Sequence, residues 1–357
     1  MREKIKLGEI IDTIQGSQYS LDEQITENKE GYLRFLRISD YTKADEPIRY
    51  VKYTGKELVC NEDEVVVVRY GNVGFIGYGK KGILANNLFV LRLKNKSFDS
   101  KYLYYYLNSP NINNAIVNKA NSSTMPALTH KMIKELEIPV VDIEEQKSIV
   151  SRLNKIQKII DIRKEQIEYL DELIKSQFVE MFGDPILNNK NWKINKWNEV
   201  LTIKNGKNQK KVEQEDGKYP IYGSGGIMSY ANNYICNEDS VIIGRKGNIN
   251  NPILVRTKFW NVDTAFGLEP CKEKIIVEYL YFFCYFYNFE KHNKAVTIPS
   301  LTKTDLLNID IPIPQIELQK RFADFVKQID KQKFEIQKSL EKMQNLYESI
   351  MDNYFGE

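Results

Sequence analysis

The chain repeats itself once, and this duplication limits the folds that it can adopt. Residues 138–184 align with residues 311–357 at a constant offset of 173, without a gap. Both copies open on Ile-Pro, reach a Gln-Lys pair (Gln146-Lys147 and Gln319-Lys320) and close on Phe-Gly. Solenoid repeats have periods of roughly 20–50 residues, so a unit this long is a domain followed by a helix.

The alignment continues upstream with small changes of offset, as insertions in surface loops would cause. The aligned pairs are Thr124–Thr129 with Thr297–Thr302, Cys60–Asp63 with Cys236–Asp239, Arg69–Asn72 with Arg245–Asn248, and Lys6–Gly16 with Lys196–Gly206. We therefore expect four parts: a first globular domain over 1–143, a central helix over 144–184, a second globular domain over 185–316 and a C-terminal helix over 317–357.

The two helical parts carry an apolar residue at alternating spacings of four and three, which is typical of a coiled coil. The predicted seam is Leu153, Ile156, Ile160, Ile167, Leu170, Ile174, Val326, Ile329, Ile336, Leu340, Met343 and Ile350. Arg163, Gln177 and Lys333 interrupt it, either to fix the register or to face partners. The simplest arrangement pairs the helices antiparallel about a pseudo-two-fold axis. The alternative is that each helix docks onto a different protein.

The globular parts are predicted to be mixed and strand-rich, which gives an α+β fold class. Glu64–Val68 and Ser240–Ile243 are β-branched runs that lead into glycine turns. Residues 99–108 and 278–288 read as short helices that hold much of the surplus of 22 Tyr and 16 Phe. We expect these aromatic side chains to form the core of each domain rather than a surface that stacks on bases.

Composition argues against several kinds of active site. The chain has 2 His and 4 Cys, with no CxxC pair and no zinc-site spacing, so we expect no metal site and reduced thiols in a cytoplasmic protein. His130 and His292 are interpreted as surface residues. No secretory signal and no membrane span is expected, since the longest apolar stretch is far shorter than the ~20 residues a span needs. We find no catalytic set.

The distribution of charge along the chain favours a binding function over catalysis. The net charge of +3 divides into +2 on residues 1–143 and +4 on 185–316, against −2 and −1 on the two helical parts. Turns that combine basic and amide side chains suit phosphates and base edges. The candidate DNA-binding residues are Arg69, Tyr70, Asn72, Lys80, Lys81, Lys204, Lys207, Lys210, Lys211, Ser224, Arg245, Lys246 and Asn248.

Over nearly its whole length the chain resembles the specificity (S) subunit of type I restriction-modification systems. The resemblance rests on the order domain, helix, domain, helix, and on Ile-Pro followed by Glu-x-Gln-Lys at both helix entries. It rests also on Tyr219–Gly226, which looks like the strand and glycine turn of the family's target recognition domains. The first domain lacks that turn and has Gly31–Ile38 in its place, so the two domains should read different half-sites.

The resemblance implies that each domain is a target recognition domain that reads one half of a bipartite double-stranded DNA target. It implies that the paired helices set the spacer and dock two methyltransferase (M) subunits. S-adenosylmethionine would be bound by those partners, with no cofactor on this chain. Restriction/translocase (R) subunits would join where the system cleaves DNA. The chain itself would then be a non-catalytic recognition subunit.

Three other interpretations stay open at this point. The chain could serve a methylation-only system without a nuclease. It could be a coiled-coil scaffold whose domains bind protein rather than DNA. It could also be an enzyme, such as a nuclease or a stand-alone methyltransferase, although the missing motifs count against this.

Overall fold

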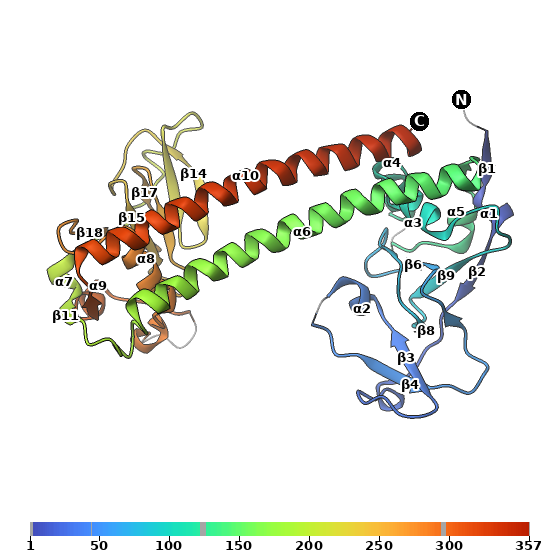
Figure 1. Ribbon diagram of the computed structural model, residues 1–357, viewed down its shortest axis with the longest axis horizontal. Helices are drawn as coiled ribbons and strands as arrows, with labels where there is room; N and C mark the ends of the chain where they lie inside the picture. Colours follow the sequence, from blue (N-terminus) through green and yellow to red (C-terminus); the bar gives the residue numbers. More distant parts are fainter. Residues whose placement is uncertain (1–2, 44, 122–125, 294–297, 357) are drawn as a thin grey trace. The chain divides into compact units, whose positions relative to one another are not determined.

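The computed structural model describes residues 3–43, 45–121, 126–293 and 298–356. The chain divides into two compact units (Figure 1): unit 1 comprises residues 1–162 and 339–357, and unit 2 comprises residues 163–338. Each unit holds one globular domain, domain 1 or domain 2, together with parts of two long helices. The predicted α+β class with two tandem domain-plus-helix units is confirmed. Thr124, Thr297 and Glu357 of the repeat lie outside the described residues.

Domain 1 is built on two four-stranded sheets and a two-stranded ribbon. The first sheet has the order β2 (Ile11–Gln15), β9 (Leu88–Leu93), β6 (Val65–Val68), β7 (Ile76–Gly77), with antiparallel neighbours. The second has the order β4 (Arg49–Lys52), β3 (Tyr32–Leu36), β8 (Gly82–Leu84), β5 (Val59–Cys60). The ribbon joins β1 (Lys4–Lys6) to β10 (Glu137–Pro139). The helices are α1 (Leu7–Ile10), α2 (Ile38–Thr42), α3 (Ser100–Asn108), α4 (Pro110–Ala120) and α5 (His130–Lys134).

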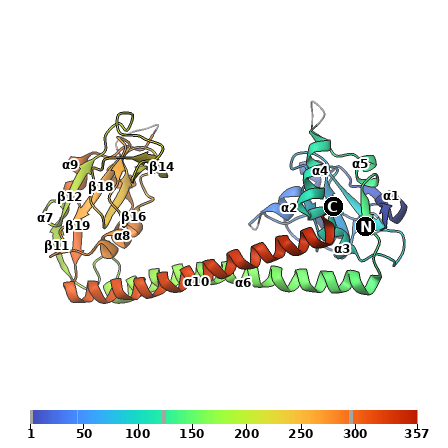
Figure 2. The same cartoon turned by 90° about the horizontal axis from the view of Figure 1, so that it is seen from above.

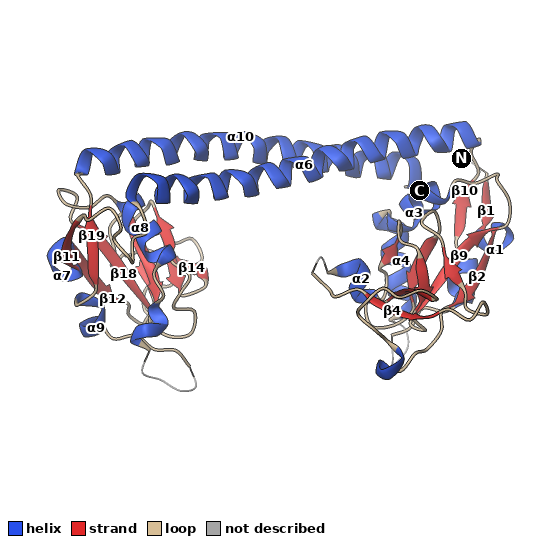
Figure 3. Ribbon diagram, turned by 60° about the horizontal axis from the view of Figure 1, so that its bottom comes forward, coloured by secondary structure: helices blue, strands red, loops and turns tan. Residues whose placement is uncertain are grey.

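Domain 2 repeats the first sheet and the ribbon (Figure 3). Its four-stranded sheet has the order β12 (Leu201–Asn205), β18 (Ala265–Pro270), β15 (Ser240–Gly244), β16 (Ile253–Val255). The ribbon joins β11 (Lys193–Lys196) to β19 (Asp310–Ile313). The other sheet is three-stranded, with the order β14 (Gly226–Ala231), β13 (Tyr219–Gly223), β17 (Trp260–Asn261). The helices are α7 (Trp197–Val200), α8 (Val277–Phe286) and α9 (Lys303–Leu307).

The tyrosine-rich helices form the core, as predicted. The carboxylate of Asp99 caps α3 by accepting hydrogen bonds from the backbone N–H groups of Lys101 and Tyr102 at 2.8 and 3.0 Å. Tyr102 and Tyr279, at matching positions of α3 and α8, are both buried. The ring of Tyr279 packs on Phe178 with the centroids 5.4 Å apart. Aromatic burial therefore joins each domain to its long helices.

The long helices are α6 (Ile143–Phe182) and α10 (Ile316–Phe355), each of 40 residues (Figure 2). In unit 1 the start of α6 lies beside the end of α10, where Arg152 Nη1 donates a hydrogen bond to the Tyr354 hydroxyl at 3.1 Å. In unit 2 the later half of α6 lies beside the first half of α10, where the Lys333 ammonium pairs with the Asp171 carboxylate. The helices are thus antiparallel within each unit, and the alternative in which each docks onto a different protein is not what the structure shows.

The predicted seam residues are all buried or half-buried, and some of them also belong to the core of a domain. Seven are buried: Leu153, Ile156, Ile160, Ile174, Val326, Ile329 and Leu340. The other five are half-buried: Ile167, Leu170, Ile336, Met343 and Ile350. Lys333 finds a carboxylate on the facing helix, and Arg163 Nη1 donates to Gln166 Oε1 at 2.8 Å. Lys333 therefore interrupts the seam where the facing helix supplies an opposite charge, whereas Arg163 bonds to a residue of its own helix.

A fully buried glutamine fastens each domain to the helix that follows it. In unit 1, Gln146 Nε2 donates to the carbonyl oxygens of Ser97 and Val141, both at 2.9 Å. In unit 2, Gln319 Nε2 donates to the carbonyl oxygens of Lys274 and Pro314 at 3.2 and 2.8 Å. Both side chains are 0% exposed. The Gln of the repeated Gln-Lys pair therefore has a structural role, and this role is the same in both units.

Within the described ranges, none of the helices combines the length and the apolar character needed to span a membrane.

Candidate nucleic-acid interface

Four loop segments that are far apart in the sequence meet in each unit. In unit 1 they are residues 16–18, 69–72, 85–88 and 126–130, which we call loop surface 1. In unit 2 they are residues 206–208, 245–248, 262–265 and 299–303, which we call loop surface 2. Three of the segments in each unit adjoin strands of the main sheet, and the fourth leads into α5 or α9 and is hydrogen-bonded to the arginine turn, so the sheet sets the positions of all four.

The same backbone hydrogen bonds hold both loop surfaces together. The Arg69 N–H donates to the carbonyl of Asn87 at 2.9 Å, and the Arg69 carbonyl accepts from the Leu128 N–H at 2.7 Å. In unit 2 the Arg245 N–H donates to the carbonyl of Thr264 at 2.8 Å, and the Arg245 carbonyl accepts from the Leu301 N–H at 2.9 Å. The arginine turn is therefore fixed from both sides in each unit.

Glycines complete this frame at matching positions. A Cβ atom on Gly16 would overlap the carbonyl oxygen of Ala85, and one on Gly206 would overlap the carbonyl oxygen of Val262. Gly71 and Gly247 have φ values of +97° and +79°, a region that side chains with a Cβ rarely adopt. The chain can make these close approaches and turns only with glycine.

Loop surface 1 carries an amide network. Asn86 Nδ2 donates to Gln18 Oε1 at 3.1 Å, and Asn86 Oδ1 accepts from the Tyr70 hydroxyl at 3.4 Å. Gln18, Arg69, Tyr70 and Asn72 are exposed. The surface thus offers a guanidinium, a phenol and two amides to solvent side by side, which suits phosphates and base edges.

His130 lies beneath this network, and the prediction that it is a surface residue is wrong. Its ring is half-buried and stacks on Phe89 with the centroids 4.4 Å apart. Gln15 Nε2 donates to the carbonyls of Asn86 and Leu88, so its Oε1 is left to accept from His130 Nε2 at 2.9 Å. Nδ1 then accepts from the Thr13 hydroxyl at 2.8 Å. Burial, together with the positive charges of Arg69 and Lys134, lowers the pKa of His130, which favours the neutral form of the ring.

His292 is also not a simple surface residue. Its ring is half-buried, and its Nε2 atom lies 2.6 Å from the hydroxyl of Tyr287. The two rings stack with an interplanar angle of 11°. Both histidines are half-buried because their rings stack on aromatic side chains of their own domain, a contact that the sequence did not predict.

Loop surface 2 has different side chains on the same frame. The guanidinium of Arg245 lies over the ring of Phe266, 5.7 Å from its centroid, and Nη1 donates to the carbonyl of Asp263 at 3.5 Å. Lys246, Asn248 and the carboxylate of Asp263 are exposed. Aromatic packing holds the Arg245 side chain at the edge of the turn, so its remaining N–H groups can face a ligand.

The lysine-rich segment of domain 2 divides into two kinds of residue. Lys207, Lys210 and Lys211 are exposed, on the chain that leaves β12. Lys204 instead lies within β12, half-buried, with its ammonium 3.6 Å from the carboxylate of Glu269. The Lys204 charge is thus paired within the domain. Lys204 is therefore not grouped with the three exposed lysines.

The other predicted residues lie outside the arginine turns. Lys80 is tied to α2, because its ammonium donates to the carbonyl of Asp40 and lies 5.4 Å from the ring centroid of Tyr41. Lys81 is exposed next to it. Ser224 is half-buried in the turn between β13 and β14. That turn follows Tyr222, whose carbonyl accepts from the Val262 N–H at 3.0 Å, so it adjoins loop surface 2.

Sequence reasoning missed Gln18, Asn86, Asn208 and Asp263. Gln18 and Asn208 each stand two residues after the aligned glycine, Gly16 or Gly206, and both carry amides. Comparison of the two copies at this glycine could have found them. Asn86 and Asp263 left no signal, because only the fold brings their loop beside the arginine turn.

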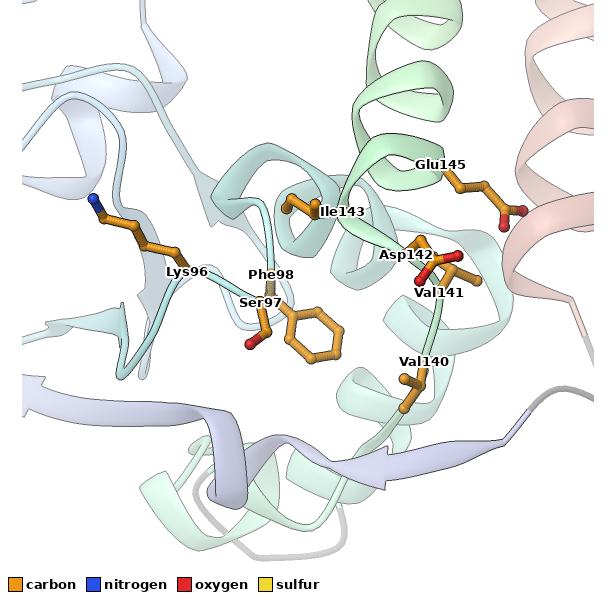
Figure 4. Close-up of a pocket in the computed structure, with 8 residues that line it drawn as sticks. All are labelled: Lys96, Ser97, Phe98, Val140, Val141, Asp142, Ile143 and Glu145. Atoms are coloured by element: carbon orange, nitrogen blue, oxygen red, sulfur yellow. The ribbon is translucent and has the colours of Figure 1, made fainter.

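Other kinds of site are less well supported. The described part of the chain contains no group of three His, Cys, Asp or Glu side chains placed to hold a metal ion. An open cavity of about 650 Å³ lies where α6 begins (Figure 4). It is lined by Lys96, Ser97, Phe98, Val140, Val141, Asp142, Ile143 and Glu145. None of these residues belongs to loop surface 1, so the cavity is separate from the candidate interface.

Comparison with known proteins agrees with this geometry. The model of the type I restriction modification DNA specificity domain matches twice, over residues 2–172 and 189–344. The type I restriction enzyme MjaVIII specificity subunit of Methanocaldococcus jannaschii is 27% identical, over 96% of this chain and 91% of its own length. The MjaIX specificity subunit of the same organism is 22% identical, over 80% of this chain and 75% of its own.

Solved structures show the same fold. The S subunit of a type I restriction-modification system from M. genitalium matches with a TM-score of 0.66 and 19% identity, over 100% of this chain and 96% of that one. A chain from a study of complex assembly and conformational transition of the type I system matches with a TM-score of 0.60 and 18% identity, over 99% and 97%. With both domains matched by the family model and the same loop frame built twice, the chain belongs to the type I restriction-modification DNA specificity family.

Proposed function

We propose that this chain is the sequence-specific DNA-binding subunit of a type I restriction-modification complex. Each domain reads one half of a bipartite double-stranded target through its loop surface. The observation that carries the proposal is the repeated backbone frame, which presents different side chains in the two units. Tyr70 and Asn86 in domain 1 correspond to Lys246 and Asp263 in domain 2, so the two half-sites differ in sequence.

The chain supplies recognition and not chemistry in this proposal. Methyltransferase subunits bind S-adenosylmethionine and modify the DNA, and restriction/translocase subunits join them where the system cleaves. The chain binds no cofactor and works in the cytoplasm. Reduced thiols are consistent with that compartment, since all four cysteines are free and Cys60, Cys236 and Cys284 are buried.

The outer face of α6 suits the docking of two methyltransferase subunits. Ile159, Ile162, Tyr169 and Leu173 repeat at spacings of three, seven and four, and are 41, 42, 71 and 45% exposed. Exposed apolar residues at helical spacing form a second stripe beside the buried seam, which is typical of a helix that receives further helices. The double substitution Y169E/L173E should abolish co-purification with the methyltransferase, whereas E168Q, on the same helix, should not.

The experiment that tests the function is co-expression with the cognate methyltransferase, followed by sequencing of modified bases in the DNA. We expect one bipartite motif with a fixed spacer, and none when either subunit is omitted. Methylation by the partner alone at the same sites would contradict the proposal. The scaffold alternative predicts that the complex shows no salt-dependent DNA binding in a mobility-shift assay.

The proposed role of the two helices in setting the spacer can be tested by changing their length. One heptad inserted into both α6 and α10 adds about 10 Å at 1.5 Å per residue. If the helices set the spacer, the unmodified gap in the motif should lengthen by about three base pairs, at 3.4 Å per base-pair step. A spacer of the original length would contradict the role of the helices, while leaving half-site reading untouched.

A further inference from the structure

Loop surface 1 orders its amide groups more strictly than exposed side chains usually are. The Asn86 carbonyl accepts from Gln15 Nε2, which fixes the backbone of the loop. The Asn86 side chain then bridges Tyr70 and Gln18, at 3.4 and 3.1 Å. Gln15 Oε1 in turn accepts from His130 Nε2 at 2.9 Å. A chain of hydrogen bonds therefore runs from the half-buried histidine to the exposed Gln18.

This network determines which way the Gln18 amide faces. Because Asn86 Nδ2 is a donor, the atom of Gln18 that it meets is the carbonyl Oε1. Gln18 Oε1 keeps a second lone pair, and its Nε2 carries two N–H groups. The residue is exposed, and among the described residues no protein partner accepts from these N–H groups. Gln18 thus presents one acceptor and one donor, adjacent and in a fixed order.

An adjacent donor and acceptor of this kind match one base in the major groove. Adenine offers the N7 acceptor beside the N6 amino donor, and Asn or Gln binds both at once. Guanine offers two acceptors, N7 and O6, so the amide oxygen would face O6 without a hydrogen bond. The neighbouring Arg69 guanidinium offers further N–H donors to the phosphates and base edges beside Gln18.

The geometry points to Gln18 as an adenine-reading residue of domain 1, with Asn86 as the residue that positions it; this inference rests on the proposed function. Domain 2 provides the contrast. There the equivalents are Asn208 and Asp263, and the Asp263 carboxylate can only accept hydrogen bonds. The corresponding position of the second half-site is therefore read by different chemistry.

The test uses the full chain with its methyltransferase partner and the substitution Q18E, with binding measured on targets that carry all four bases at each half-site position. The carboxylate of the Q18E variant can still accept a hydrogen bond from the N6 amino group of adenine, but it can no longer donate one to N7. It can also accept from the N4 amino group of cytosine. We expect the preference for adenine at one position of one half-site to fall about 5- to 150-fold, the range for one bidentate base contact. Cytosine should gain there, and the other half-site should not change.

Q18A and N86A are the second and third variants. Q18A should lose the preference without gaining cytosine, and N86A should weaken the preference at the same position. N208A is the matched control and should act on the other half-site only. If Q18E and Q18A keep the wild-type preference at every position, the inference is overturned while the proposed function stands. If the wild-type complex shows no bipartite preference, the proposed function fails as well.

Discussion

The side-chain carbonyl of Gln146 accepts a hydrogen bond of 2.8 Å from the backbone N–H of Asp99, the residue that caps α3. The same contact recurs in unit 2, where Gln319 Oε1 accepts from the Ile276 N–H at 2.9 Å ahead of α8. One buried amide therefore links the start of each long helix to the start of an aromatic core helix. A domain and its helix cannot separate without leaving these polar groups unpaired.

Replacing Gln146 by leucine should therefore destabilise unit 1. The N–H of Asp99 and the carbonyls of Ser97 and Val141 would lose their partner, and an unsatisfied buried polar group costs about 1–3 kcal/mol. We expect the free energy of unfolding, measured with urea, to fall by at least this amount. Q332L, which changes an exposed glutamine of α10, is the matched control and should have little effect. Equal stability of Q146L and Q332L would contradict a structural role for the buried amide.

Removing the charges of Lys207, Lys210 and Lys211 together should weaken DNA binding uniformly across sequences. Each phosphate contact contributes about −0.9 to the slope of log K against log salt concentration. The triple change to glutamine should thus make the slope shallower by up to about 2.7 units, in a titration at several salt concentrations. K204Q should leave the slope nearly unchanged, because the Lys204 ammonium is already paired with Glu269. A larger effect from K204Q than from the triple variant would refute this division of the segment.

R245A should act on one half-site alone. The guanidinium is positioned by Phe266 on loop surface 2, so its loss should relax base preference in the half-site that domain 2 reads. Competition between target variants mutated in one half or the other measures this effect. R69A is the counterpart in unit 1 and should affect the opposite half. An equal loss in both halves from either variant would argue against two independent reading surfaces.

His130 should titrate below the usual histidine pKa of about 6.5. Folding keeps its ring neutral at pH values where the unfolded chain binds a proton, so the folded state binds fewer protons. The free energy of unfolding should therefore fall as the pH drops below about 6.5, until the folded ring is itself protonated. NMR of the ring protons can follow the titration, and H130Q assigns the signal because the chain has only 2 histidines. H130Q should also remove this part of the pH dependence. An unshifted pKa would contradict the buried network.

The repeat made the fold predictable at the level of elements. Heptad spacing predicted helices close to α6 and α10, because a stripe of apolar residues is a local signal. The aromatic helices α3 and α8 were also found from local composition. The second sheet of each domain was not predicted. Its strand pairs, β3 with β8 and β13 with β17, join residues about 40 to 50 positions apart in the sequence, so no local pattern signals them.

The candidate site was only partly accessible from the sequence. Arg69 and Arg245 stood out because they head matching glycine turns. The sequence could not reveal that Lys204 pairs with Glu269, since that contact crosses between two strands. It also could not reveal Asn86, whose loop meets the arginine turn only after the sheet has formed.

The glycine approaches at Gly16 and Gly206 have a consequence for how such a protein can change over generations. These backbone positions admit no side chain, whereas the exposed positions two residues later hold Gln18 in one copy and Asn208 in the other. A library that randomised both kinds of position should return nothing but glycine at the first and many different residues at the second. New target preferences can thus arise by point mutation without any cost to the architecture that carries them.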